Sequence, residues 1–273
     1  MRYVNMNGKL LPEEDAALPL HSSAFRYGHG LFETMLVQDG VIQLVPLHWQ
    51  RLESGMKALG LQFPKHFTVQ KLEEQVLQTV EKNNLQSLCR IRLQVHTLSD
   101  GLYDELHPAQ YLIECYPLQE SIIGLNENGL VVGTYKDVRK SADAVSAYKT
   151  TNALVYALAA QAAKRAKWND ALILNSAGNI IEGTIANIFW IKAGQIYTPP
   201  VSEGCVAGIM RNYLMTLLLA KGYTVIEQPL TKETLAKADE VFLTNAIRRI
   251  KWVRQWEDNS YGWSMVQQIA RLL

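Results

Sequence analysis

The chain has 273 residues, 48% apolar and 19% charged, which is typical of a globular protein long enough to bury a substantial core. Its 27 Lys and Arg nearly balance its 26 Asp and Glu, so no broad electrostatic surface for nucleic acid or an anionic membrane is indicated. The three cysteines form no CxxC pair, which argues against a zinc site or a disulfide framework. Because of this cysteine pattern, we expect no metal site. Since the cysteine count is odd, the start of the sequence lacks an apolar signal core and no run could cross a bilayer, we expect a cytoplasmic protein.

Two hairpins are predicted near the start of the chain. An Asn-Gly or Asp-Gly pair between apolar, β-rich runs is the strongest short-range signal for a hairpin turn. Asn7-Gly8 lies within such a stretch over residues 3–11, and Asp39-Gly40 separates the runs 31–37 and 41–45.

Two helices are predicted next, over residues 46–59 and 69–82. Pro46 suits the first turn of the first helix, and Thr68 can cap the second. Both segments carry apolar residues at helical spacing, so each is expected to cover a sheet with one face.

Two strands are predicted over residues 88–97 and 110–117, with a loop at 99–108 between them. Arg90, Arg92 and Gln94 alternate with apolar residues, so one face of the first strand is expected to be polar and basic.

The stretch 124–129 is polar and rich in turn residues, and it suggests a boundary between a smaller domain over 1–123 and a larger one over 124–273. Beyond it, a helix rich in Ala and Leu is predicted over 151–167 and a β-meander over about 171–200. Hairpins outnumber βαβ units in both parts. This pattern favours an α+β fold with antiparallel or mixed sheets.

Lys149 and Glu182 are the first candidates for chemistry. Lys149 lies among small and apolar residues, which can lower the pKa of its amine and favour the neutral form that a Schiff base requires. Glu182 begins a strand, and a carboxylate there can pair with a pyridinium nitrogen. The plainer alternative is that both are solvated side chains at the ends of a helix and a strand.

Three further segments are candidates for binding a phosphate. Gly208, Ile209 and Met210 begin a helix, and free amides at a helix N-terminus attract anions. The segment 244–246 offers a hydroxyl and further amides, and Arg51 offers a cationic fork. Each also has a plain alternative, since many glycine loops only cap helices and Arg51 can be a solvated helix residue.

Taken in order, these segments resemble the class IV aminotransferase family. The resemblance rests on RYGHGLFET, HWQRL, Lys149 before an Asn-bearing helix, EGTIANIF with its TPP sequel, and GIMR, and it runs from about residue 3 to residue 250. The family comprises fold-type IV pyridoxal-phosphate enzymes: branched-chain aminotransferases, D-amino-acid aminotransferases and aminodeoxychorismate lyase. It implies a two-domain fold like that of D-amino-acid aminotransferase, a homodimer, and pyridoxal 5'-phosphate bound by the larger domain.

The resemblance also implies a role for each candidate residue. Lys149 would form the Schiff base with the cofactor and move the Cα proton, while Glu182 would pair with the pyridine nitrogen. The phosphate would be held by Arg51, the amides of Ile209 and Met210, and the turn at Asn245 and Ala246. The substrate pocket would be lined by Phe32, Arg90 and Arg92.

The motifs lean towards one member of the family. Met210 and Ala246 stand where the aminotransferases usually carry hydroxyls, and GIMR, the Asn-Ala pair and the compact length look more like aminodeoxychorismate lyase of folate biosynthesis. That enzyme eliminates pyruvate and leaves 4-aminobenzoate. Arg92 falls where branched-chain aminotransferases place a carboxylate-binding arginine, so a branched-chain or D-amino-acid aminotransferase using 2-oxoglutarate is the alternative. A non-enzymatic descendant that keeps the fold is a third.

Overall fold

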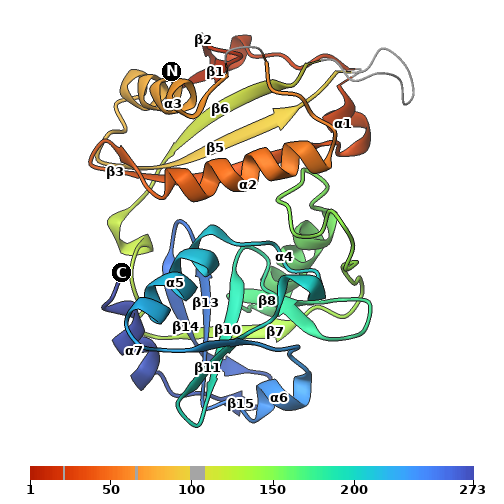
Figure 1. Ribbon diagram of the computed structural model, residues 1–273, viewed down its shortest axis with the longest axis vertical. Helices are drawn as coiled ribbons and strands as arrows, with labels where there is room; N and C mark the ends of the chain where they lie inside the picture. The colour runs from red at the N-terminus through yellow and green to blue at the C-terminus, as the bar shows by residue number, and fades with distance from the viewer. Residues whose placement is uncertain (21, 65–66, 99–107) are drawn as a thin grey trace. The chain divides into compact units, whose positions relative to one another are not determined.

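The computed structural model describes residues 1–20, 22–64, 67–98 and 108–273, which form two compact units (Figure 1). Unit 1 comprises Met1–Ile122 and Tyr148–Asn152, and unit 2 comprises Ile123–Ala147 and Ala153–Leu273. The predicted domain boundary after residue 123 stays a prediction. Apart from Pro108, the loop predicted at 99–108 lies outside the described residues.

Unit 1 is an antiparallel sheet with two long helices packed on one face. The strands follow the order β2-β1-β6-β5-β3-β4, and every pair in this order is antiparallel. The strands are β1 (Tyr3–Met6), β2 (Lys9–Pro12), β3 (Gly30–Gln38), β4 (Val41–Ile42), β5 (Leu88–His96) and β6 (Gln110–Pro117). The helices are α1 (Ser23–Tyr27), α2 (Val45–Ala58) and α3 (Val69–Lys82).

Both predicted hairpins are confirmed. Asn7 and Gly8 have φ of 52° and 88°, and Asp39 and Gly40 have φ of 51° and 73°, the left-handed backbone that a two-residue hairpin turn requires. The second hairpin has a shorter return strand than predicted, because β4 ends at Ile42 and α2 begins at Val45. The predicted cap of α3 is also confirmed, since the Lys71 amide donates to Thr68 Oγ1 at 3.2 Å.

The two faces of the unit 1 sheet differ because side chains alternate along each strand. The face under α2 and α3 is the core, where Leu52 and Met56 of α2 and Val76 of α3 pack on Ile91 and Leu93 of β5. The opposite face carries the polar and basic residues of β5. The alternation predicted from the sequence is therefore confirmed.

One charged cluster lies on the core side of this sheet. Glu33 of β3 accepts hydrogen bonds from Arg51 Nε at 2.8 Å and Arg51 Nη2 at 2.6 Å, and His48 Nδ1 contacts it at 2.6 Å. Burial alone would raise the pKa of Glu33, but Arg51 and His48 outweigh burial and lower it from 4.5 to about 2. The carboxylate therefore stays ionised and holds the fork of Arg51 in a fixed orientation.

The segment around Lys149 lies beside β3, where Thr150 forms an isolated bridge with Leu31. The Phe32 amide donates to the Lys149 carbonyl at 2.9 Å, and the Thr151 amide donates to the Gly30 carbonyl at 2.9 Å. Thr151 Oγ1 also donates to the Gly28 carbonyl at 2.6 Å. The predicted start of the following helix at Thr151 was therefore wrong: Thr151 bonds to the backbone of Gly28 and Gly30, and α4 (Leu154–Ala166) begins three residues later.

Unit 2 is built on a sheet that closes into a ring. Its strand order is β12-β11-β10-β13-β14-β7-β8-β9, and an additional pairing joins β9 to β10. The strands are β7 (Leu130–Thr134), β8 (Asp170–Leu174), β9 (Ile180–Glu182), β10 (Asn187–Lys192), β11 (Gln195–Thr198), β12 (Val225–Glu227), β13 (Glu240–Asn245), β14 (Arg249–Trp256) and β15 (Asn259–Ser260). Parallel pairs join β14 to β7, β7 to β8 and β11 to β12. With the antiparallel sheet of unit 1, this mixed sheet confirms the predicted α+β class.

Helices cover the outside of this ring while apolar side chains fill its inside. Alternate residues of β10 separate the two cores: Ile188 and Trp190 belong to the cluster enclosed by the strands, and Phe189 and Ile191 pack against helices. The helices on the outside besides α4 are α5 (Ile209–Ala220) and α7 (Ser264–Ala270), whereas α6 (Lys232–Ala236) adds Leu235 to the enclosed cluster. No helix in the described ranges is both long and apolar enough to cross a membrane.

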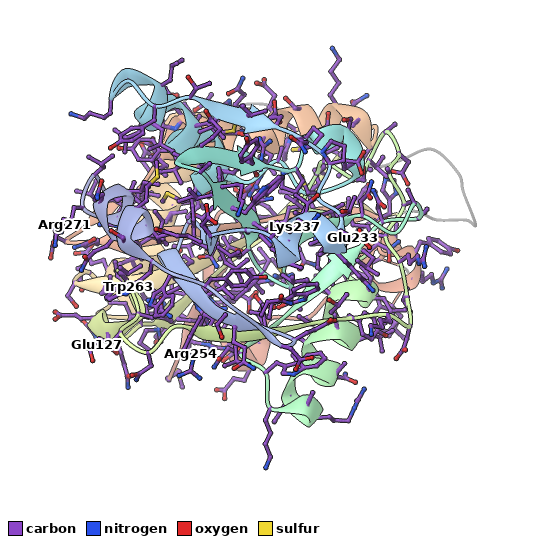
Figure 2. The ribbon with its side chains drawn as sticks, turned by 90° about the horizontal axis from the view of Figure 1, so that it is seen from below. Glu127, Glu233, Lys237, Arg254, Trp263 and Arg271 are labelled. Atoms are coloured by element: carbon purple, nitrogen blue, oxygen red, sulfur yellow. The ribbon has the colours of Figure 1, made fainter. Side chains whose placement is uncertain are left out.

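The face of unit 2 seen in Figure 2 carries charges of both signs. The labelled residues are Glu127, Glu233, Lys237, Arg254, Trp263 and Arg271. Trp263 stacks on Trp252 with ring centroids 5.1 Å apart, so this partly exposed ring is fixed against β14.

We predict that the Glu33 cluster makes unit 1 sensitive to acid. Because the pKa of Glu33 is lower in the folded chain than in the unfolded one, the cluster stabilises the fold fully above about pH 4.5 and loses this contribution as the pH falls towards about 2. The shift corresponds to about 3 kcal/mol. Urea unfolding of wild type and Glu33→Gln should show a stability difference that shrinks over this range. A difference that stays constant across it would contradict the prediction.

Candidate active site

A row of three polar residues crosses neighbouring strands of unit 2. Glu182 at the end of β9 pairs with Asn187 at the start of β10, and Asn187 pairs with Thr244 near the end of β13. All three are buried. Because adjacent strands lie 4.7–4.9 Å apart, the row spans about 10 Å. A polar, buried row of this length at strand ends is unusual for a core and marks the candidate site.

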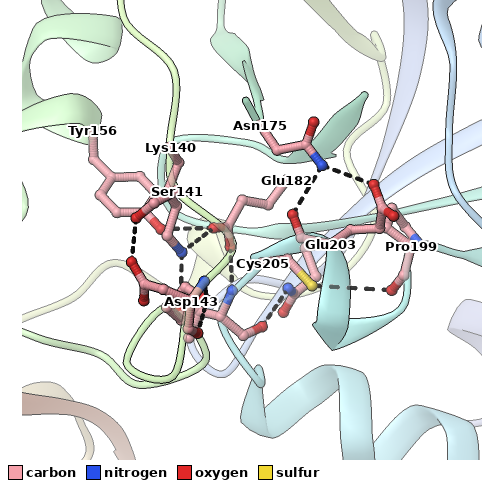
Figure 3. Close-up of polar contacts among 12 residues, drawn as sticks. Lys140, Ser141, Asp143, Tyr156, Asn175, Glu182, Pro199, Glu203 and Cys205 are labelled. Atoms are coloured by element: carbon pink, nitrogen blue, oxygen red, sulfur yellow. Dashed lines mark hydrogen bonds and ion pairs between the residues drawn. The ribbon is translucent and has the colours of Figure 1, made fainter. Parts of the chain in front are cut away.

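Glu182 is held by three donors from separate segments (Figure 3). Tyr156 Oη donates to Glu182 Oε1 at 2.6 Å, and Lys140 Nζ donates to the same oxygen at 3.0 Å. The Val206 amide donates to Glu182 Oε2 at 3.1 Å. The side chain of Glu182 is only 4% exposed, so these contacts replace the water that an ionised carboxylate would otherwise need.

Tyr156 is the neutral member of this cluster. Burial first, and the neighbouring Glu182 second, raise the pKa of the Tyr156 phenol far above its usual range. The phenol therefore stays protonated and donates its hydrogen to the carboxylate. Lys140 also donates to the Ser146 carbonyl at 2.9 Å and lies 5.3 Å from the centroid of the Tyr156 ring.

Sequence reasoning did not include Lys140 and Tyr156. One signal for Tyr156 was available, because Tyr156, Ala159 and Ala163 follow the i, i+3, i+7 spacing of a buried helix face, and both alanines are buried. Lys140 carried no such signal, since Lys140 lies in a loop and its partner Glu182 is 42 residues further along the chain.

The start of α5 lies against the same row. The Asn187 Nδ2 amide donates to the Val206 carbonyl at 2.8 Å. A Cβ at Gly208 would collide with Asn187 Oδ1, so only glycine allows this approach. Gly208 caps the 12-residue helix α5 without a side-chain hydrogen bond. The first turn of α5, with the predicted Ile209 and Met210, thus has the backbone amides of an anion site.

Two observations concern the turn after β13. Thr244 Oγ1 is buried without a hydrogen-bond partner among the described residues, which leaves a hydroxyl available for a ligand. Asn245 Oδ1 accepts from the amides of Ile247 at 3.0 Å and Arg248 at 2.8 Å. The Asn245 side chain therefore closes its own turn, and only the backbone of Asn245 and Ala246 remains a candidate for binding phosphate.

The other predicted residues lie in unit 1. Lys149 Nζ is 4.5 Å and Arg92 Cζ is 4.0 Å from the centroid of the Phe32 ring. Arg92 Nη2 also donates to Gln94 at 3.0 Å, while Arg90 Cζ is 4.5 Å from the centroid of the Tyr116 ring. Phe32, Arg90 and Arg92 therefore share the sheet face opposite α2 and α3, as the register of β3 with β5 requires.

Burial and charge both act on this face. Burial lowers the pKa of Arg92, while Glu114 opposes that shift. Arg51, the predicted phosphate ligand, belongs to the other side of the sheet, where Glu33 holds it. Across the described ranges, no three His, Cys, Asp or Glu side chains are grouped to hold a metal ion.

Comparison with known proteins gives the family. Residues 30–256 match the family described as amino-transferase class IV. The chain belongs to the class IV aminotransferase family. Membership of this enzyme family confirms the resemblance, the enzyme class and the cofactor pyridoxal 5'-phosphate predicted from the sequence.

Individual relatives carry two different activity names. A Methanocaldococcus jannaschii protein provisionally named as a branched-chain-amino-acid aminotransferase is 32% identical, covering 99% of this chain and 93% of that one. The aminodeoxychorismate lyase of Bacillus subtilis is 27% identical, covering 95% of this chain and 88% of that one. The branched-chain aminotransferase of Thermoproteus uzoniensis, solved with norvaline, aligns with a TM-score of 0.89 at 25% identity, covering 99% and 92%. This match confirms the fold-type IV architecture.

The residues of unit 2 fit the cofactor of this class IV family. Glu182 offers a buried carboxylate for a protonated ring nitrogen, because its three neighbours donate to it and its Oε2 accepts only the Val206 amide among the described residues. The orphaned Thr244 hydroxyl and the uncapped start of α5 offer donors for a phosphate. Glu182 and Thr244 lie at opposite ends of one row, and the start of α5 lies against Asn187 between them.

We predict that Gly208→Ala weakens binding of pyridoxal 5'-phosphate by about tenfold or more, equivalent to at least about 1.4 kcal/mol. The added methyl group collides with Asn187 and displaces the start of α5. Fluorescence titration of the cofactor-free protein measures the change. Gly262→Ala is the matched control, because its Cβ would meet nothing closer than 3.6 Å. Equal binding by the two variants would count against a phosphate site at α5.

Proposed function

We propose that this class IV enzyme is a 4-amino-4-deoxychorismate lyase, which releases pyruvate and leaves 4-aminobenzoate. The observation that carries the proposal is the polar, basic character of the face around Phe32. Two arginines, Arg90 and Arg92, lie two residues apart on one strand and one face. Such a face suits a substrate with two carboxylates, one on its ring and one on its enolpyruvyl group, better than one with an aliphatic side chain.

The same proposal assigns the residues that would hold the cofactor. Lys149 would carry the covalent bond to pyridoxal 5'-phosphate, and Glu182 would accept a hydrogen bond from its ring nitrogen. Thr244 and the amides of Ile209 and Met210 would bind its phosphate, with Arg51 and the backbone of 245–246 as the further ligands proposed from the sequence. The bound cofactor supplies an electron sink for the carbon that loses its proton.

Residues of the chain carry out the proton transfer and bind the substrate. The amine of Lys149, displaced by the substrate amine, takes the proton from the substrate carbon that carries the nitrogen. Loss of the enolpyruvyl oxygen from the neighbouring carbon gives the aromatic ring, and the departing group gains a proton to become pyruvate. Arg90 and Arg92 hold the substrate carboxylates, and Phe32 packs against the substrate ring.

Transamination is the second candidate, and Arg92 is the observation that favours it. A single guanidinium beside the Phe32 ring suits the second carboxylate of 2-oxoglutarate or glutamate, and the 32% identity to the Methanocaldococcus jannaschii protein supports the same activity. In this case Lys149 would hold the proton taken from the substrate carbon and give it back, and no substituent would leave the substrate. Both reactions use the same cofactor residues, so only the substrate face distinguishes them.

We predict that the purified protein is yellow and that Lys149→Ala loses the visible absorption band of the covalently bound cofactor. The variant lacks the amine that makes the bond. Lys140→Arg is the matched control, because it keeps a cation near Glu182 and is expected to keep the band. A colourless wild-type protein that stays colourless after incubation with pyridoxal 5'-phosphate would rule out the proposed function.

A pair of assays separates the two candidate reactions. We predict formation of 4-aminobenzoate and pyruvate from 4-amino-4-deoxychorismate, with catalytic efficiency at least about 100-fold above that for leucine, D-alanine or glutamate with the matching 2-oxo acid. Arg90→Met should raise KM for the lyase substrate more than it lowers kcat, since the arginine binds substrate. Efficient transamination without formation of 4-aminobenzoate would replace the proposal by its alternative.

A further inference from the structure

Two side chains around Glu182 have no role in the reaction as described so far. Tyr156 and Lys140 come from α4 and from the loop after β7, and both donate to the same oxygen, Glu182 Oε1. One cation would neutralise the buried carboxylate by itself. The second donor on that oxygen therefore needs a separate explanation.

The hydrogen bonds on the two oxygens of Glu182 explain this second donor. Each carboxylate oxygen accepts about two hydrogen bonds. Tyr156 and Lys140 fill the capacity of Oε1, while Oε2 accepts the Val206 amide. The acceptor capacity that remains is on Oε2, the oxygen on the side of Val206 and the start of α5.

The cluster also fixes the orientation of the carboxylate. Lys140 is itself tied to the Ser146 carbonyl, and Tyr156 belongs to a packed cluster with Ala159 and Ile173. Glu182 is therefore held from two separate segments on one oxygen and from the backbone on the other. Since all three neighbours donate, the carboxylate remains an acceptor and takes only a partner that carries a hydrogen.

We propose that Tyr156 and Lys140 are positioning residues, which orient Glu182 so that its Oε2 accepts a hydrogen bond from the protonated ring nitrogen of the cofactor. The inference rests on the proposed function in requiring that this chain binds pyridoxal 5'-phosphate. It goes further in assigning the recognition of the ring nitrogen to a three-residue unit. Tyr156 acts through Glu182 and touches neither substrate nor cofactor.

The test compares two ligands that differ only at the ring nitrogen. Cofactor-free protein is titrated with pyridoxal 5'-phosphate and with 1-deazapyridoxal 5'-phosphate, in which a carbon replaces that nitrogen. We expect Tyr156→Phe to bind the first about tenfold more weakly and the second unchanged, because only the first uses the oriented carboxylate. Tyr135→Phe is the matched control, since Tyr135 is buried in the same cluster.

The outcomes separate this inference from the proposed function. Wild-type protein that binds neither ligand overturns the proposed function. Wild-type protein that binds the cofactor, with Tyr156→Phe unchanged or weakened equally for both ligands, leaves that function standing and overturns the positioning role. If Tyr156→Phe does not fold, Lys140→Met and Lys140→Arg carry the same test. The preference for the nitrogen-containing ligand should fall in the first and persist in the second, and any other pattern contradicts the inference.

Discussion

The pairing of Glu182 with Asn187 is the contact on which unit 2 depends. This pairing joins β9 to β10 and closes the strand ring, and the same register places Asn187 beside Thr244 on β13. One backbone pairing therefore both completes the sheet and lines up the polar row. Asn187 then fixes the start of α5 through Val206 and Gly208. A shift of the β9 register by one residue would turn Glu182 to the other side of the sheet, and Glu182 would no longer lie beside Asn187 and Thr244.

In unit 1, a comparable constraint acts on β3, which carries a different function on each face. Glu33 points to the helix side and orders Arg51 and His48, while Phe32 points to the other side and contacts Arg92 and Lys149. The backbone of β3 also holds the Lys149 segment through the Phe32 amide. A single strand thus positions a buried ion cluster, an aromatic ring and the lysine proposed as the catalytic base.

Local signals in the sequence explain what was predicted well. Asn7-Gly8 and Asp39-Gly40 are residue pairs that readily adopt the positive φ of a hairpin turn. Thr68 caps α3 by accepting a hydrogen bond from a residue only three positions away. Long-range contacts explain the rest. Lys140 reaches Glu182 across 42 residues, and the start of α4 is set by bonds from Thr151 to Gly28 and Gly30, which override the helix propensity of the segment. No window along the chain contains both partners of such a contact.

The two units also separate what the class IV members share from what distinguishes them. The row in unit 2 contains the groups proposed for the ring nitrogen and the phosphate, which every reaction of the cofactor needs. The face of β5 contains Arg90 and Arg92, which the cofactor does not need. Relatives with two activity names match nearly the whole chain at 32% and 27% identity, so overall similarity reports mostly the shared scaffold. Under the proposed function, a few side chains on the β5 face decide between lyase and transaminase, because both reactions use the same electron sink and differ in the substrate that is held beside it.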